Sequence, residues 1–246
     1  MMKTSWLQDL NIPVTLSALS NAGAFLSYEH QLHLADVLGT HSWQVDLKVP
    51  RFSVTGDHPL TCTAMHLLGT AAPGPRSWLW SWGNPSGFAP AVTGLAAWLR
   101  DFGTKHGITE LTTAEVPFAE LPGEPEDPGN ATWALVNAAK AASGCWTAYT
   151  GHAGGGTRAA FLIEHPDFQL PPPSGPRVMR VLEEGLVGAV PISDHRLAVR
   201  SYAAGRGLEA LWSERSVALS GPGLDLVFEF DELGRIGTMT ANMHAT

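Results

Sequence analysis

The chain has 246 residues, of which 44% are hydrophobic and only 15% are charged. A chain of this length forms one large domain or two small ones and buries about 70–75% of the surface that its unfolded state exposes. The net charge of −8 argues against nucleic-acid binding, because Lys and Arg supply the affinity for phosphates. It argues equally against attachment to an anionic membrane. A partner protein with a basic surface is electrostatically easier to bind.

Export and covalent cross-linking are not expected either. The first residues contain no long apolar run before Asp9, unlike a signal peptide. No stretch reaches the ~18–20 apolar residues of a membrane span. Cys62 and Cys145 are too few for a disulfide framework. We therefore expect a cytoplasmic protein with free thiols, and the excess of Arg over Lys suggests a GC-rich bacterial genome.

The first part of the chain predicts a helix followed by antiparallel strands. Apolar residues at helical spacing, closed by Gly39, predict a helix over residues 22–38. The apolar period then changes to two, and turn residues divide 42–82 into a meander of about four antiparallel strands. One of these strands covers Leu60 to Leu68, and the last covers 77–82. An apolar stripe predicts a second helix over 90–106.

The middle of the chain is rich in acids and turn residues. Residues 109–128 hold six acids and no base, which predicts a solvated acidic loop. We expect a helix to begin near Asn130 or Thr132 and to end at Ser143. Residues 145–163 then predict a hairpin around a glycine-rich loop. The proline-rich segment 169–176 predicts a semi-rigid linker.

The C-terminal part predicts two helices and then a sheet, with a loose tail from Asn242. The expected helices cover 178–190 and 194–206, and the expected strands cover 209–213, 216–220, 224–230 and 235–241. The predicted fold class is α+β, because strands and helices do not alternate strictly. It consists of an α+β domain with a Trp-rich strand (residues 1–168) and a smaller helix-helix-sheet unit (residues 177–246).

The densest chemical feature is the segment Trp78 to Ser86, which reads WLWSWGNPS. Side chains alternate across a strand, so Trp78, Trp80 and Trp82 would project from one face about 6.6 Å apart. Two interpretations compete. The indoles can pack the core beneath helix 90–106, or they can line a groove in which Asn84 adds polar contacts.

Other clusters predict neither a metal nor a cofactor. His58, Cys62 and His66 are spaced by four residues, but on a strand that spacing spans about 13 Å. One zinc ion needs its ligands within about 2.0–2.3 Å. The glycine-rich run 151–156 lacks the Lys and the following helix of a phosphate-binding loop, which favours a hairpin turn.

Residues 26–165 resemble an uncharacterised bacterial family, one of the domains of unknown function. The resemblance rests on Gln31-Leu32, Trp43 with Asp46, Leu68-Gly69-Thr70 and the run from Trp78 to Asn84. Phe102-Gly103 and Leu111-Thr112 also fit, whereas Gly83 stands where the family usually has Ala. The resemblance implies a bacterial α+β protein and supplies no activity.

Two functions follow as expectations. The absence of a recognisable catalytic motif, the negative charge and the Trp-rich strand favour a non-catalytic protein that binds a partner with a basic surface. An immunity-type inhibitor of a basic toxin is one form of this. The alternative is an enzyme or small-ligand binder with a pocket at Trp78, Trp80, Trp82 and Asn84. His66, His106 or Asp101 would then supply general acid–base chemistry.

Overall fold

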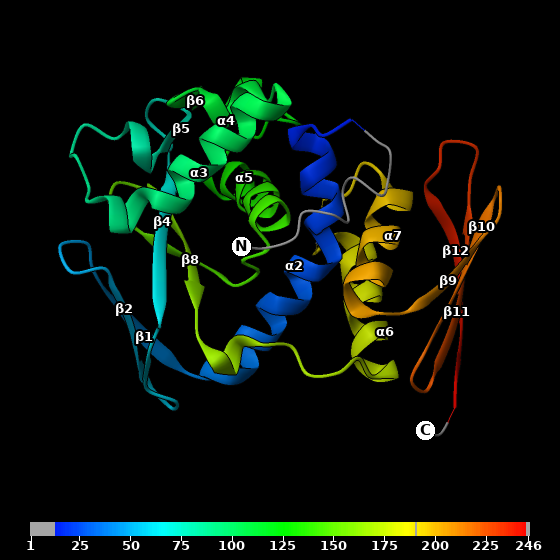
Figure 1. The fold of residues 1–246 in the computed structure, drawn as a ribbon. Helices are drawn as coiled ribbons and strands as arrows, with labels where there is room; N and C mark the ends of the chain where they lie inside the picture. Colours follow the sequence, from blue (N-terminus) through cyan, green and yellow to red (C-terminus); the bar gives the residue numbers. More distant parts are fainter. Residues whose placement is uncertain (1–12, 190, 245–246) are drawn as a thin grey trace. The chain divides into compact units, whose positions relative to one another are not determined.

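The structure is a computed structural model that describes residues 13–189 and 191–244 (Figure 1). Contacts divide the chain into two compact units. The first contains Met1–Ser20 and His30–Gln169, and the second contains Asn21–Glu29 and Leu170–Thr246. The division into a domain of residues 1–168, a linker of residues 169–176 and a unit of residues 177–246 stays a prediction. Residues 1–12, in which no signal peptide is expected, lie outside the described residues.

The expected α+β class is confirmed, since the described chain combines helices with three antiparallel sheets. No described helix is both long enough and apolar enough to cross a bilayer. The helices that contribute to the first unit are α2 (Leu16–Leu38, whose middle belongs to the second unit), α3 (Pro90–His106), α4 (Thr109–Thr112) and α5 (Pro128–Ser143). Its strands are β1 (His41–Asp46), β2 (Arg51–Gly56), β3 (Leu60–Thr61), β4 (Ala64–Ala72), β5 (Ser77–Trp80), β6 (Glu115–Pro117), β7 (Ala148–His152) and β8 (Arg158–Glu164).

The strands of the first unit form two sheets, not the single meander expected from the sequence. One sheet has the order β1-β2-β3, and the other has the order β6-β5-β4-β8-β7. The expected strand from Leu60 to Leu68 is interrupted at Cys62 and Thr63. The first of its pieces stays beside β2, and the second pairs with β8. The interruption occurs because β4 pairs with β8, which follows about 100 residues later in the chain. The spacing of apolar residues along one segment cannot reveal such a distant partner.

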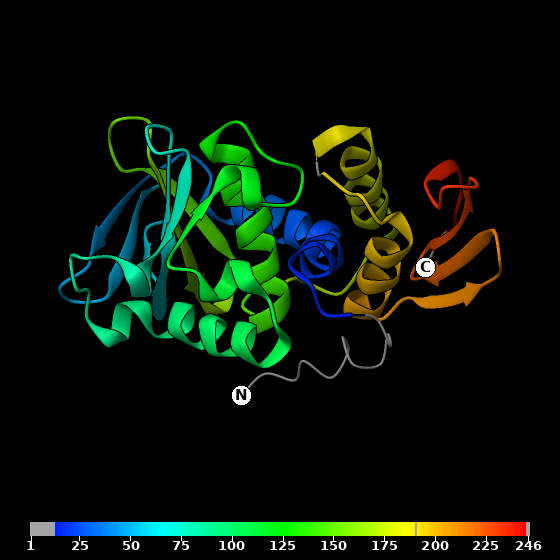
Figure 2. The same ribbon diagram turned by 90° about the horizontal axis from the view of Figure 1, so that it is seen from above.

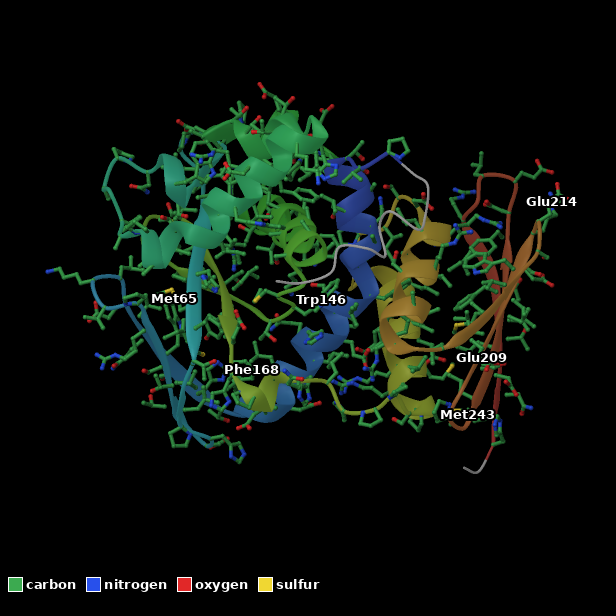
Figure 3. All side chains as sticks on the ribbon, viewed as in Figure 1. Met65, Trp146, Phe168, Glu209, Glu214 and Met243 are labelled. Atoms are coloured by element: carbon green, nitrogen blue, oxygen red, sulfur yellow. The ribbon has the colours of Figure 1, made fainter. Side chains whose placement is uncertain are left out.

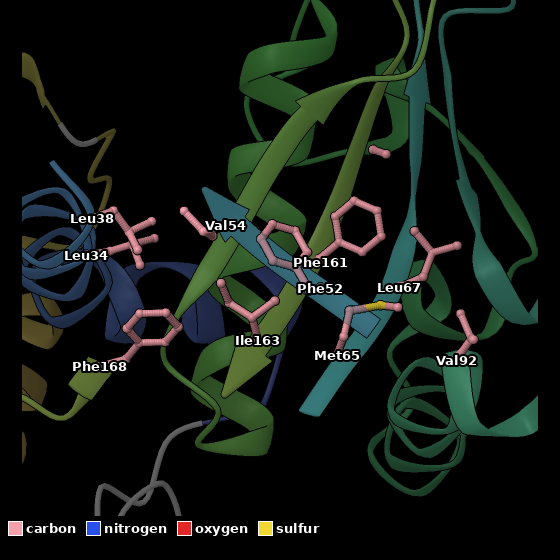
Figure 4. Packing of buried hydrophobic residues seen from close by; sticks show 11 residues of the cluster. Leu34, Leu38, Phe52, Val54, Met65, Leu67, Val92, Phe161, Ile163 and Phe168 are labelled. Carbon is pink, nitrogen blue, oxygen red and sulfur yellow. The ribbon is translucent and has the colours of Figure 1, made fainter. Parts of the chain in front are cut away.

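One hydrophobic cluster of the first unit joins these two sheets (Figure 4). Phe52 and Val54 of β2 pack against Met65 and Leu67 of β4 and against residues of β8 that include Phe161. Phe52 and Phe161 meet edge to face with their ring centroids 5.9 Å apart. Helix α5 contacts β4, β5 and β8. The five-stranded sheet is therefore covered by side chains on both faces.

The acidic segment 109–128 is not the plain solvated loop that its charges predict. It contains α4, β6 and a 3₁₀ turn at Phe118–Glu120. The prediction failed because the acids are interleaved with apolar residues that the fold buries. These are Leu111, Val116, Phe118 and Leu121.

Local capping chemistry explains where the next elements begin and end. Helix α5 begins one turn earlier than expected, because the carboxylate of Asp127 accepts the N–H groups of Gly129 and Asn130. The hairpin of β7 and β8 around the glycine-rich loop is confirmed. Gly151 is required there, because a Cβ at this position would lie 2.1 Å from the ring of Trp43.

The second unit is a four-stranded antiparallel sheet with two helices on one face (Figure 2). Its helices are α6 (Gly175–Glu184) and α7 (His195–Arg206), and its strands are β9 (Glu209–Trp212), β10 (Ser216–Gly221), β11 (Leu224–Phe230) and β12 (Ile236–Met243). The strand order is β12-β11-β10-β9. The loose tail expected from Asn242 is wrong, because this residue pairs with Asp225.

A buried ion cluster fixes the middle of α2 to the helices of the second unit. The side chain of Glu29 is 1% exposed and lies 3.0 Å from Nε of Arg206. The hydroxyl of Tyr202 donates to the same carboxylate over 3.0 Å. Burial, and secondarily the charge of Glu29, raise the pKa of Tyr202, so the phenol stays a donor at every ordinary pH.

We predict that Glu29→Ala lowers the free energy of unfolding by about 3–5 kcal/mol, because it leaves the buried charge of Arg206 without its carboxylate partner. Urea denaturation followed by circular dichroism measures this loss. The double variant Glu29→Met with Arg206→Met serves as the control and should lose much less, since both fully buried charges are removed together. The third charged group, Arg177, lies 4.0 Å from Glu29 and is 20% exposed, so it keeps access to water. An equal loss in both variants would show that shape, and not charge pairing, holds the cluster.

Candidate functional site: an acidic outer sheet face

The structure places Trp78 and Trp80 in the core of the first unit. Both side chains are 0% exposed, and their ring centroids lie 5.3 Å apart in an edge-on arrangement. The indole N–H of Trp80 donates to the carbonyl of Glu110 over 2.8 Å. Gly69 on the neighbouring strand leaves room for the ring of Trp78. A Cβ atom on residue 69 would lie 2.7 Å from a carbon of that ring, which is too close. In this conformation the two rings fill the interior and line no open groove.

Trp82 and Asn84 lie elsewhere, because the extended chain ends at Trp80. Residues Ser81–Gly83 form a 3₁₀ turn, so Trp82 does not continue the row of indoles expected for a strand over 77–82. The guanidinium of Arg100 lies 5.4 Å from the centroid of the Trp82 ring. Trp82 and Asn84 are both partly exposed, and of the four expected site residues only these two reach the surface.

The three expected acid–base residues have separate environments. Nε2 of His66 lies 3.5 Å from the carboxylate of Glu164. The ring of His106 lies 4.4 Å from that of Phe102, and burial lowers the pKa of this histidine. Asp101 is 69% exposed and pairs with its neighbour Arg100.

Lys140 is a buried lysine in the first unit. Its side chain is 2% exposed on α5, and burial lowers its pKa from 10.5 to about 7. Burial also raises the pKa of the nearby Cys145 thiol to about 12. At neutral pH this cysteine is therefore a protonated, unreactive thiol.

The surface with the clearest chemical character lies in the second unit. In β11 every second residue is buried, from Leu224 to Phe230, and the residues between them are exposed. The same alternation, carried across the paired strands, defines a surface that we call the outer face. It comprises Glu209, Leu211, Ser216, Ala218, Ser220, Asp225, Val227, Glu229, Thr238, Thr240 and Asn242.

The outer face combines an apolar centre with negative charge. Leu211, Ala218 and Val227 lie opposite one another on three successive strands, and Leu211 is 78% exposed. Glu209, Asp225 and Glu229 flank this row, and the outer face contains neither Lys nor Arg. Figure 3 labels Glu209 on β9 and Glu214 in the turn that follows it.

Arginines of the same unit lie on the opposite side of the sheet. The guanidinium of Arg196 lies 4.5 Å from the ring centroid of Phe230, and that of Arg200 lies 4.9 Å from the centroid of Trp212. Both arginines belong to α7, which contacts the inner side of the sheet. The sheet thus separates cations on its inner side from acids on its outer face.

A hollow of about 530 Å³ lies at one end of this sheet. Its walls come from the segment that leads into α6 and from the ends of the strands: Pro173, Ser174, Gly175, Pro176, Pro222, Gly223, Met243 and His244. The imidazole of His244 lies 3.8 Å from the carboxylate of Asp225. Among the described residues, no three His, Cys, Asp or Glu side chains are grouped closely enough to hold a metal ion.

The outer face is not among the sites expected from the sequence, because residues 224–230 by themselves predict only a strand. The run LDLVFEF alternates apolar residues with Asp225, Val227 and Glu229. This period of two already marks one buried and one solvated face. Which other strands add their side chains to that face depends on pairing, which the sequence period does not give.

We predict that Trp80→Ala lowers the free energy of unfolding by about 3–5 kcal/mol, because it empties a fully packed core position. Urea denaturation followed by circular dichroism measures the change. Trp98→Ala is the matched control, since Trp98 is 43% exposed and its loss should cost far less. A Trp80→Ala protein as stable as the wild type would contradict the core assignment.

Lys140 should make stability rise with pH. Between about pH 7 and pH 8.5 the unfolded chain keeps this lysine protonated, whereas the folded chain loses the proton, so deprotonation favours the folded state. Above that window the buried thiols of Cys62 and Cys145, both with pKa raised to about 12, act in the opposite direction.

Lys140→Met should flatten this rise, and the exposed Lys105→Met should preserve it. Free energies of unfolding from urea titrations at both ends of the window test the prediction. A steep rise that persists in Lys140→Met would assign the effect to another group.

The comparisons with known proteins define the family of the chain without an activity. No curated protein and no solved structure matches it. A family model described as a family of unknown function, DUF6882, matches residues 17–166, which is more than half of the 246 residues. The sheet of β9 to β12 lies beyond this match. The expected membership in an uncharacterised family is therefore confirmed: the chain belongs to the DUF6882 family.

Proposed function

We propose that the protein binds another protein through the outer face, and that the partner presents Lys and Arg side chains around an apolar patch. The observation that supports this is the row of Leu211, Ala218 and Val227 on the open face of the sheet, flanked by three acids and by no Lys or Arg. An inhibitor of a basic enzyme, as in an immunity protein, is one form of this function.

The negative charge of the outer face favours a partner whose contact surface is positively charged. The outer face has three carboxylates and no Lys or Arg, with the imidazole of His244 3.8 Å from one of them, Asp225. These carboxylates contribute to the net charge of −8 for the chain. Such a surface attracts cationic proteins over long range and speeds their association. It also repels acidic proteins, so it selects among partners before contact.

The shape of the outer face fits a protein better than a small molecule. Small ligands bind in concave sites that enclose most of their surface, whereas this is the open face of a sheet. A large exposed apolar side chain such as Leu211 has the character of an interface anchor. The turns at one end of the sheet extend the surface, with Glu214 between β9 and β10 and the 76% exposed Leu233 between β11 and β12.

Charge reversal tests this proposal. The variant Glu209→Lys, Asp225→Lys, Glu229→Lys should lose the bound partner in affinity capture from the native host, with affinity reduced about tenfold or more. The matched control Glu120→Lys, Glu124→Lys, Glu126→Lys changes the net charge equally at three exposed acids of the first unit and should retain the partner. The wild-type complex should weaken as salt increases.

The proposal fails in either of two cases. One is a partner that the outer-face variant captures as well as the wild type does. The other is the recovery of uncomplexed protein from the host at native expression.

A further inference from the structure

We propose that the chain forms a two-fold symmetric dimer by antiparallel pairing of β12 with β12 of a second copy. In the described part of the chain β12 is an edge strand, hydrogen-bonded to β11 alone. It has eight residues and is the longest edge strand described. An edge of this kind presents a row of backbone N–H and C=O groups ready to pair with another strand.

The direction of these groups follows from one hydrogen bond. The N–H of His244 donates to the carbonyl of Gly223, which places the backbone groups of the even-numbered residues on the β11 side. Backbone groups alternate along an antiparallel strand. The N–H and C=O groups of Met239, Ala241 and Met243 therefore point to the open edge.

The sequence of β12 lacks the features that protect other edges. Proteins block edge pairing with charges, Pro or short strands. The opposite edge strand of the same sheet, β9, has four residues and begins with Glu209, and β6 has three residues with both Glu115 and Pro117. Strand β12 reads IGTMTANM and carries neither a charge nor a proline.

The absence of charge on β12 suits a second copy as the partner strand. A basic partner would gain nothing from a neutral edge, whereas two identical neutral strands meet without repulsion. The nearest outer-face acids, Asp225 and Glu229, lie on β11. In the dimer the two β11 strands would be three strand spacings apart, about 14 Å, which exceeds the Debye length of about 8–10 Å at physiological salt.

Hydrogen-bond alternation restricts the register of the dimer. Residues with outward backbone groups must face each other, and a register in which Met239 pairs with Ala241 of the other copy satisfies this rule. The pairing shift between Glu229 and Phe230 disturbs β12 near its start, which favours a register centred on Thr240. Thr240 then faces Thr240 at the two-fold axis, as a pair without hydrogen bonds whose Cα atoms are about 4.5 Å apart.

Cysteine cross-linking tests both the dimer and its register. Thr240→Cys should form a disulfide-linked dimer under mild oxidation, because its Cα separation falls within disulfide range. Thr238→Cys is the matched control on the same face of the same strand. In the proposed register its two copies are about 14 Å apart, so it should remain uncross-linked, as should the wild type with its free Cys62 and Cys145.

Ala241→Pro provides an independent test by removing an outward N–H that β11 does not use. In light scattering coupled to size exclusion, the wild type should shift from monomer to dimer as concentration rises. Ala241→Pro should stay monomeric with an unchanged far-ultraviolet circular dichroism spectrum. A wild type that is monomeric at tens of micromolar, equal cross-linking of both cysteine variants, or a dimer that survives Ala241→Pro would each overturn the proposal.

Discussion

Each β-strand of this protein divides its side chains between two faces, and this constraint governs the properties described above. In the first unit both faces of the five-stranded sheet are covered, so its strands are rich in buried residues and Trp78 and Trp80 become core. In the second unit helices cover one face only. The same alternation then exposes Asp225, Val227 and Glu229, which face solvent because Leu224, Leu226 and Phe228 face the helices.

Charge reinforces this division in the second unit. Arg196 and Arg200 lie against aromatic rings on the inner side of the sheet, while the acids occupy the outer face. The buried Glu29 is an exception that the fold accommodates by surrounding it with Arg206 and Tyr202. Buried charges need such partners, whereas the acids of the outer face have water and remain available to a cationic surface.

The match to the DUF6882 family and the outer face involve different parts of the chain. The family model covers residues 17–166, which include the three-stranded sheet, the five-stranded sheet and the Trp-rich strand. The proposed contacts use residues from Glu209 onward. The burial of Trp78 and Trp80 gives that strand a structural role, and Trp82 and Asn84 are the members of the segment that a ligand could reach.

The sequence by itself determined the elements whose signals are local. The helix over Pro90–His106, the hairpin around the glycine-rich loop and the four C-terminal strands follow from apolar period and turn residues. Only the tertiary structure decided the separation of β3 from β4, the burial of the acidic segment and the side of the sheet that stays open. The physical reason is that these features depend on pairing between residues far apart in the chain, such as β4 with β8, whereas period and capping report only on neighbours along it.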